Sequence, residues 1–252
     1  RCQGGGNIDR PRCACGGEVI PRCVRDEQKA DFCRSLLAGD LTACVRSVLW
    51  ALPAPSVYSV TKLIASAPPA PQRVVVKLGT GVLSTPAGKS LDSSQFTRIS
   101  AEIAALQTAG YSCILVSSAA IAAGVRIMHL KQRPTDLPGK QACAAAGQPE
   151  LMRLYATSFR KHDLSVAQLL LTHGDIDSLM HRENARNTLD RLLEHGVIPI
   201  INENDSVAVE ELRFGDNDRL SAEVAVLAQA DHLIILTSVD GLQDEDGNRV
   251  KK

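Results

Sequence analysis

Aromatic residues are scarce in this chain of 252 residues, at 3% of the composition, and neither charge is in excess, because 28 lysines and arginines balance 28 acidic residues. So few aromatic side chains cannot form the stacking platforms on which proteins hold single-stranded nucleic acids. A net charge of zero provides no positive field for a nucleic acid or an anionic membrane. No stretch approaches the roughly 18 uninterrupted apolar residues of a transmembrane helix. We therefore expect neither nucleic acid nor membrane among the partners.

Several catalytic motifs are also missing. The chain has no Walker A loop, no G-x-G-x-x-G and no G-x-S-x-G, and its six histidines are scattered without H-x-x-x-H spacing. The glycines after the first predicted strand therefore form neither a Walker A loop nor a G-x-G-x-x-G loop, and a serine hydrolase is not expected. We nominate no residue as a metal ligand.

Cysteine and proline are concentrated at the N-terminus. Six of the eight cysteines precede residue 45 without C-x-x-C spacing or a histidine among them, so a structural zinc site is poorly supported. Their even number is compatible with a secreted disulfide framework, but nothing downstream is typical of an extracellular protein. Cys113 and Cys143 lie in apolar segments and are expected to be buried.

The run A-P-P-A-P at 67–71 predicts an extended linker and a boundary near residue 72. Residues 1–72 are expected to be an unstructured extension or the product of a wrongly chosen gene start, apart from a short helix over 30–48. The chain begins with Arg1 rather than methionine, so its true start is expected to lie elsewhere. Residues 73–252 are expected to be the folded domain.

From residue 73 onward, apolar β-branched runs alternate with amphipathic segments. Strands are predicted over 73–78, 112–117, 164–171, 197–201 and 231–237, and helices over 92–109, 119–127, 140–161, 184–195 and 218–230, with a hairpin turn at 246–247. This alternation predicts an α/β fold, an open and mainly parallel sheet between helices. In such sheets ligands bind beyond the carboxyl ends of the strands.

Polar residues follow three of the predicted strands. Lys77 and G-T-G at 79–81 suit a phosphate or form a plain tight turn. S-S-A-A at 117–120 can cradle an anion at a helix start or simply cap the helix. N-E-N-D at 202–205 and G-D-N-D at 215–218 bracket a predicted loop or hairpin over 207–214. Amides and carboxylates of this kind can hold an ammonium group, a lysine or Mg²⁺, whereas a single cluster can also be solvated surface.

Six segments carry a resemblance when they are taken in order: V-V-K-L-G-T-G-V-L at 75–83, A-A-I-A-A-G at 119–124, K-Q-A-C-A-A-A-G-Q at 140–148, N-A-R-N-T-L at 184–189, P-I-I-N-E-N-D at 199–205 and G-D-N-D at 215–218. Together they resemble the amino-acid kinase superfamily and, within it, the glutamate 5-kinase (γ-glutamyl kinase) family. The similarity extends from Val74 to about Leu242.

The resemblance implies a cytoplasmic enzyme that phosphorylates the side-chain carboxylate of L-glutamate with ATP and Mg²⁺, the first step of proline biosynthesis. It implies proline as a feedback inhibitor and a homo-oligomer when the chain is complete. It also implies catalytic roles for Lys77 and Asp218. The glutamate-binding residues would be Ser118, Asp205, Asn217 and Asn202, and the nucleotide-binding residues Lys77, Gly79, Thr237 and Ser238.

Three departures from the family pattern qualify these expectations. Ala119 replaces the usual glycine, which costs roughly 1–2 kcal/mol if the position needs a positive φ. Ser238 and Gln243 replace the usual Asp and Tyr of the nucleotide site. The later glycine-rich segment and a second catalytic lysine are absent, so the domain is expected to be incomplete at its C-terminal end.

Two alternatives therefore remain beside a partial glutamate kinase. The first is a catalytically incompetent fragment that binds only glutamate or proline. The second, against which N-E-N-D and G-D-N-D argue, is a kinase of the same superfamily with another acceptor.

Overall fold

The computed structural model describes residues 47–51, 72–85, 90–208 and 216–236, with the backbone alone for 47–51 and 216. Within these ranges, six parallel strands form one sheet in the order β1-β6-β2-β3-β5-β4. The strands are β1 (Ser47–Ala51), β2 (Arg73–Leu78), β3 (Ser112–Val116), β4 (Val166–Leu171), β5 (Ile198–Glu203) and β6 (His232–Leu236). The parallel α/β architecture predicted from the sequence is confirmed.

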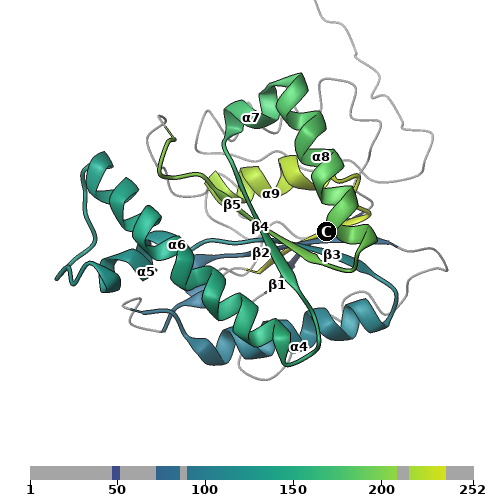
Figure 1. The fold of residues 1–252 in the computed structure, drawn as a ribbon, viewed down its shortest axis with the longest axis horizontal. Helices are drawn as coiled ribbons and strands as arrows, with labels where there is room; N and C mark the ends of the chain where they lie inside the picture. Colours follow the sequence, from purple (N-terminus) through teal and green to yellow (C-terminus); the bar gives the residue numbers. More distant parts are fainter. Residues whose placement is uncertain (1–46, 52–71, 86–89, 209–215, 237–252) are drawn as a thin grey trace, which may run out of the picture. The chain divides into compact units, whose positions relative to one another are not determined.

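Helices cover both faces of the sheet (Figure 1). They are α3 (Thr80–Leu83), α4 (Ser93–Thr108), α5 (Ala120–Ile127), α6 (Leu137–Arg160), α7 (His173–Asp177), α8 (Leu179–Glu194) and α9 (Asp216–Leu227). On one face, α4 and α6 pack against the sheet, and on the other face α8 and α9 do so. None of the helices in the part of the chain described is long and apolar enough to cross a bilayer.

The strand residues alternate between two hydrophobic cores, as the period of two in a strand requires. In β2, Val74 and Val76 contact the core beneath α4 and α6, which includes Phe96 and Tyr155. Val75 faces the opposite core, beneath α8 and α9. The same alternation places the side chain of Lys77, two residues after Val75, on the α9 face of the sheet.

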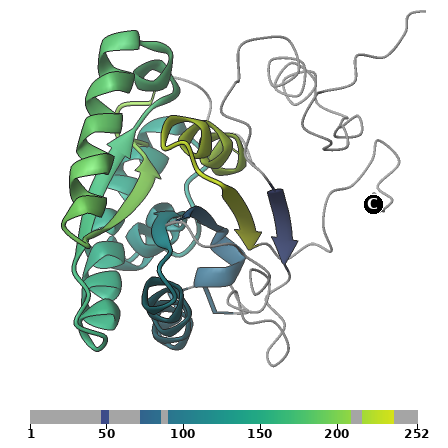
Figure 2. The same cartoon turned by 90° about the vertical axis from the view of Figure 1, so that its right-hand side faces the viewer.

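Strand β1 departs from the expectation for the N-terminal segment. Its five residues pair in parallel with β6, from Ser47 opposite His232 to Ala51 opposite Leu236. Figure 2 shows the two strands side by side. Val, Leu and Trp in S-V-L-W-A are favoured in strands, and the edge of β6 offers a free hydrogen-bonding ladder. The predicted helix over 30–48 lies outside the described residues except at its last two positions, which are strand.

Most helix ends follow the capping signals in the sequence. Asp92 caps α4 by accepting a hydrogen bond from the backbone N–H of Ser94, at 2.9 Å. A hydrogen bond from the Ser94 hydroxyl, at 2.6 Å, and then the backbone bond hold the pKa of that carboxyl below its usual value. Helix α6 begins at Leu137, earlier than predicted, because Asp136 caps it. Helix α8 begins at Leu179 instead of residue 184, and α7 was not predicted.

The order of the strands creates a crevice between β3 and β5. These neighbouring strands pair through Leu115 with Ile200 and Val116 with Ile201. The chain leaves β3 for α5 and α6 on one face, whereas it leaves β5 for α9 on the other face. Two adjacent strands whose connections diverge in this way open a cleft at their carboxyl ends. Residues 117–120 and 202–206 lie at this position.

Candidate functional site

A lysine and an aspartate meet at the carboxyl end of β2. The ammonium nitrogen of Lys77 lies 2.6 Å from Oδ1 of Asp218 in α9. Lys77 is buried, and the side chain of Asp218 keeps about a third of its surface exposed. The ion pair therefore fixes the position of the Lys77 ammonium at the edge of the sheet. The structure brings together the two residues predicted to be catalytic.

A serine and an asparagine form a second pair, between the β3 loop and α9. The side-chain nitrogen of Asn217 donates a hydrogen bond to Oγ of buried Ser118, at 2.8 Å. The side-chain oxygen of Asn217 is buried and finds no donor among the described residues. Because its side-chain nitrogen donates to Ser118, the side-chain oxygen of Asn217 is the atom that can accept a hydrogen bond from a ligand. Asn217 and Asp218 are consecutive, so α9 places both pairs next to one another.

The loop that carries Ser118 is strained at the next residue. Ala119 caps α5 with φ +78° and ψ 9°, in the left-handed region. Here the sequence has alanine where the resemblance implies glycine, and the structure confirms that the position has a positive φ. A hydrogen bond between the hydroxyl groups of Ser117 and Tyr155, 2.8 Å apart, connects this loop to α6. Complete burial raises the pKa of Tyr155, which therefore stays protonated.

Asn202 lies at the end of β5, where it connects the strand to α6. Its side-chain nitrogen donates to Oε1 of Gln148 at 2.9 Å, and its side-chain oxygen accepts from the backbone N–H of Glu203 at 3.0 Å. All three of these residues are buried. Both polar atoms of the Asn202 side chain are thus hydrogen-bonded within the protein. The bond to Gln148 holds the Gln148 amide in one orientation.

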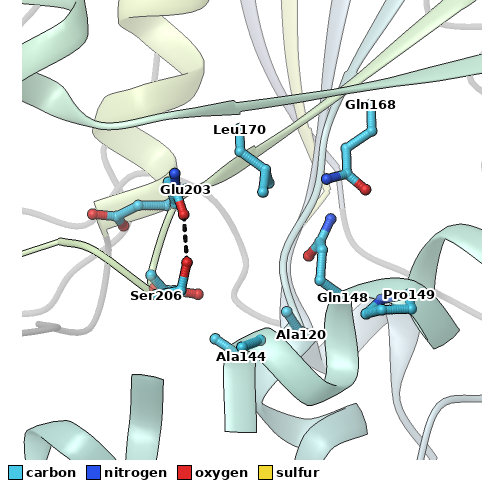
Figure 3. A pocket seen from close by; sticks show the side chains of 11 residues that line it. Ala120, Ala144, Gln148, Pro149, Gln168, Leu170, Glu203 and Ser206 are labelled. Atoms are coloured by element: carbon cyan, nitrogen blue, oxygen red, sulfur yellow. Dashed lines mark hydrogen bonds between the residues drawn. The ribbon is translucent and has the colours of Figure 1, made fainter. Parts of the chain in front are cut away.

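A pocket of about 460 Å³ opens beside these residues, between α5, α6, β4 and the loop after β5 (Figure 3). Such a volume suits a small metabolite. Its wall combines small apolar side chains with amides and carboxylates: Ala120, Ala144, Ala145, Gln148, Pro149, Gln168, Leu170, Glu203, Asn204, Asp205 and Ser206. Of the predicted glutamate-binding residues, Asp205 lines this pocket directly.

Gly79 follows the last residue of β2 and lies near the side chain of Lys77. A methyl group at this position would come 3.4 Å from the Lys77 ammonium nitrogen and 3.4 Å from the Leu236 carbonyl oxygen. The backbone of Gly79 therefore lies close to the ammonium group, and its lack of a side chain leaves that side of the ammonium group uncovered. The other two predicted nucleotide-binding residues, Thr237 and Ser238, lie outside the described residues, as do most of the predicted 207–214 loop and the hairpin turn at 246–247.

These residues fit a nucleotide phosphate better than a dedicated metal site. A buried ammonium group, uncovered on the side of Gly79, suits phosphate oxygens. Across the residues described, no three His, Cys, Asp or Glu side chains gather closely enough to hold a metal ion. Mg²⁺ commonly binds through one or two carboxylates together with substrate phosphates.

Reasoning from the sequence missed two features next to the site. The sequence motif K-Q-A-C-A-A-A-G-Q contains Gln148 without indicating a role for it, although a single amide in the stretch A-A-A-G-Q of α6 is a usable signal. His173, 2.8 Å from Glu223, joins α7 to α9, and no local pattern indicates a contact between residues so far apart in the chain.

Cys113 and Cys143 are buried free thiols, as predicted, and burial raises the pKa of Cys113 to about 12.

Comparisons with known proteins find curated relatives that share about half of the aligned residues. The chain is 49% identical over 175 residues to a protein named glutamate 5-kinase from Geobacter sp. (strain M21), covering 69% of this chain and 47% of the relative. Identity is 52% over 171 residues with the protein of that name from Desulfitobacterium hafniense (strain Y51), covering 68% of this chain and 46% of the relative. The chain spans about half the length of the curated relatives it matches.

Solved structures give a weaker similarity. UMP kinase from Bacillus anthracis is 17% identical with a TM-score of 0.45, covering 68% of each chain. Aspartate kinase from Synechocystis is 16% identical with a TM-score of 0.44, covering 67% of this chain and 28% of that one.

The comparison with protein families covers the whole segment that contains the site. Residues 72–252 match the model of the amino acid kinase family. They include every strand from β2 to β6 and all the residues of the two polar pairs. Since this match extends over more than half of the sequence, the chain belongs to the amino acid kinase family.

Proposed function

We propose that the protein transfers the terminal phosphoryl group of ATP to the side-chain carboxylate of L-glutamate, the first step of proline biosynthesis. The observation that carries the proposal is the identity of about half of the aligned positions with proteins named glutamate 5-kinase. The amino acid kinase match over residues 72–252 contains both polar pairs and the pocket. ATP and Mg²⁺, inhibition by proline, assembly into a homo-oligomer and a cytoplasmic location belong to the same proposal.

Lys77 is assigned to the transferring phosphoryl group. Two anions, the acceptor carboxylate and the nucleotide phosphate, must approach each other, so a cation between them lowers the barrier by electrostatic stabilisation. The ion pair with Asp218 holds the ammonium group in place at 2.6 Å. Asp218 thus acts as a positioning residue. MgATP supplies the phosphoryl group and further positive charge.

The polar pair of Ser118 and Asn217 is assigned to L-glutamate, together with Asp205 and Asn202. Asn217 offers a buried acceptor, and Ser118 is held by the donor of the same amide. Asp205 contributes a carboxylate to the pocket wall, which suits an α-ammonium group. The observed contacts of Asn202 with Gln148 and Glu203 give it a supporting role in the wall of the pocket.

No general base is needed for this chemistry. The side-chain carboxylate of glutamate is already ionised at neutral pH, because its pKa is ordinarily about 4.3. Catalysis then consists of alignment of the two substrates and neutralisation of charge. The two polar pairs, at the ends of β2 and β3, are suited to both tasks.

Trapping of the acyl phosphate tests the proposal. The protein is incubated with MgATP, L-glutamate and hydroxylamine, and glutamyl hydroxamate is measured alongside ADP. We expect hydroxamate that depends on L-glutamate and is absent with L-aspartate. Binding of L-glutamate in a calorimetric titration without hydroxamate or ADP would refute phosphoryl transfer, and the absence of both binding and hydroxamate would refute L-glutamate as the substrate.

A second candidate function is binding of an amino acid without phosphoryl transfer. The position of the pocket favours it, because α5, α6, β4 and the loop after β5 form its wall without Lys77 or Asp218. Binding of L-glutamate or L-proline in a calorimetric titration, with no glutamate-dependent release of ADP, would select this function.

A further inference from the structure

The side-chain amides of Asn202 and Gln148 form a hydrogen-bonded chain with a fixed direction. The backbone N–H of Glu203 can only donate, so the atom of Asn202 that lies 3.0 Å from it is the oxygen. The other atom of Asn202 is then the nitrogen, which must donate to an oxygen of Gln148, 2.9 Å away. A backbone group thereby settles the orientation of both amides, which geometry alone rarely does.

The last atom of this chain is a donor that faces the pocket. Gln148 is 8% exposed, and its nitrogen Nε2 finds no acceptor among the residues that the structure describes. Gln148 lines the pocket, and Figure 3 shows its side chain extending from α6 toward Leu170 and Gln168 of β4. A buried donor left unpaired is unfavourable, because it has lost its hydrogen bonds to water without gaining a partner. A ligand that brings an oxygen acceptor supplies that partner.

The opposite wall of the pocket has the opposite polarity. Asn204 and Asp205 line it from the loop after β5, and Asp205 brings a carboxylate, whereas the carboxylate of Glu203 points away from Gln148 (Figure 3). Glu203 is buried, and Asn204 is held by a hydrogen bond from its backbone N–H to the Leu171 carbonyl oxygen, at 2.9 Å. A donor on α6 and the Asp205 carboxylate on the loop after β5 match the carboxylate and ammonium groups of an α-amino acid.

The position of the two polar pairs determines which end of the ligand meets Gln148. Lys77 and Asp218 do not line the pocket, whereas Ala120, two residues after Ser118, does. The reacting carboxylate must lie toward Lys77, past Ser118 and Asn217. The α-carbon end of the ligand therefore lies deeper in the pocket, on the side of Gln148.

We propose that the side-chain nitrogen of Gln148 donates a hydrogen bond to the α-carboxylate of the amino-acid substrate and makes Gln148 a specificity-determining residue. This inference rests on the proposed function for the identity of the substrate. Asn202 has the role of a positioning residue, because it fixes the direction in which the Gln148 amide points.

The substitution Gln148→Glu tests the donor with little change in shape. One carboxylate oxygen still accepts the hydrogen bond from Asn202, while the other replaces the pocket-facing nitrogen and repels a carboxylate. We expect the affinity for L-glutamate, measured by calorimetry on the full chain, to fall by about a hundredfold or more. Gln107→Glu, which adds the same charge on α4, is the matched control and should bind L-glutamate like the unaltered protein.

A second ligand identifies the group that Gln148 contacts. 4-Aminobutanoate is L-glutamate without its α-carboxylate. If Gln148 binds that carboxylate, Gln148→Glu should change the affinity for 4-aminobutanoate by no more than about twofold, as in a double-mutant cycle between protein and ligand. An equal loss for both ligands would overturn the assignment to the α-carboxylate.

Nuclear magnetic resonance provides a readout that does not require the variant to fold. The side-chain amide signals of Gln148 are followed in the ¹⁵N-labelled, unaltered protein during addition of L-glutamate. A downfield shift of an amide proton of Gln148 supports the inference, and unchanged signals at saturation overturn it.

The outcomes separate this inference from the proposed function. Binding of L-glutamate with no effect of Gln148→Glu removes the role of Gln148 and leaves the function intact. Binding of L-aspartate or L-proline instead of L-glutamate, abolished by Gln148→Glu, supports the role of Gln148 and removes the substrate. Binding of none of these three amino acids by the unaltered protein overturns both.

Discussion

The ammonium nitrogen of Lys77 lies 2.6 Å from Oδ1 of Asp218, which joins the end of β2 to the first turn of α9. The contact is possible because the side chain of Lys77, like that of Val75, is on the face of β2 that α9 covers. The residue before Asp218 holds Ser118 at the end of β3. The first turn of α9 thus holds the Lys77 ammonium group at the end of β2 and the Ser118 hydroxyl group after β3.

Replacement of Lys77 by alanine removes the cation assigned to the transferring phosphoryl group. We expect a loss of about 3 kcal/mol of transition-state stabilisation, the cost of removing one preorganised electrostatic donor. The ratio kcat/KM, from hydroxamate formation with L-glutamate and MgATP, should fall by more than about a hundredfold. Lys161→Ala, on the exposed end of α6, is the control. Turnover by Lys77→Ala close to that of the control would refute the assigned role.

Helices and strands were predictable from the sequence wherever a local pattern of apolar residues was enough to determine the element. The run R-V-V-V-K-L predicts β2 with its observed ends because apolar β-branched residues suit a strand buried on both faces. Leu179 and Met180, in contrast, are 70% and 65% exposed, so the first turn of α8 has no buried apolar face for periodicity to detect. Helix α7 was missed for a related reason, since it is a single short turn held by a capping box of Thr172 and Asp175.

The polar residues of the site could be chosen from the sequence, but their partners could not. The strand ends drew attention to the polar segments at 117–120, 202–205 and 215–218, because ligands bind at the carboxyl edge of parallel sheets, and the resemblance then selected Ser118, Asn202 and Asn217 within them. That Asn217 contacts Ser118 depends on the position of β3 beside β5, a consequence of strand order. Local patterns carry no information on pairings between such distant segments.

Ala119 has a backbone conformation that costs free energy. Its φ of +78° places the residue in the left-handed region, which is unfavourable by roughly 1–2 kcal/mol for residues other than glycine. We expect Ala119→Gly to raise the free energy of unfolding by about 1 kcal/mol in urea titrations, part of the gain being offset by loss of the buried methyl group. Ala122→Gly, within α5, should lower it by a similar amount. Equal destabilisation by both substitutions would contradict the strain at Ala119.

Close packing of α5 on α6 requires glycine at position 147. A methyl group at Gly147 would overlap the carbonyl oxygen of Ala120 and the backbone nitrogen of Gly124. Rigid backbone cannot yield as a flexible side chain can, so we expect Gly147→Ala to lower the free energy of unfolding by about 3 kcal/mol. Gly174→Ala is the control, because the nearest atom to its methyl group is Thr172 Oγ1 at 3.7 Å. Equal stability of the two variants would show that α6 moves away at little cost.

The contact between His173 and Glu223 makes stability depend on pH. Nδ1 of His173 lies 2.8 Å from Oε2 of Glu223, and this hydrogen bond, aided by the charges of Glu223 and Glu203, raises the pKa of His173 above 6.5 despite burial and the opposing charge of Arg219. Arg219 holds the other oxygen of Glu223 at 2.8 Å. The folded protein therefore binds a proton more tightly at His173 than the unfolded chain does.

The sign of the effect follows from this raised pKa. The added stability is fully present below pH 6.5, the value for the unfolded chain, and is lost as the pH rises through the higher value in the folded protein. Relative to the unaltered protein, His173→Gln should lower the free energy of unfolding most below that pH, by about 1 kcal/mol, and less as the pH rises. Urea titrations from about pH 5 to about pH 8 measure the difference. His181→Gln is the control, because His181 contacts Asp175 with half of its side chain exposed and the solvent weakens that pair. A difference for His173→Gln that stays constant with pH would mean that His173 does not gain a proton on folding.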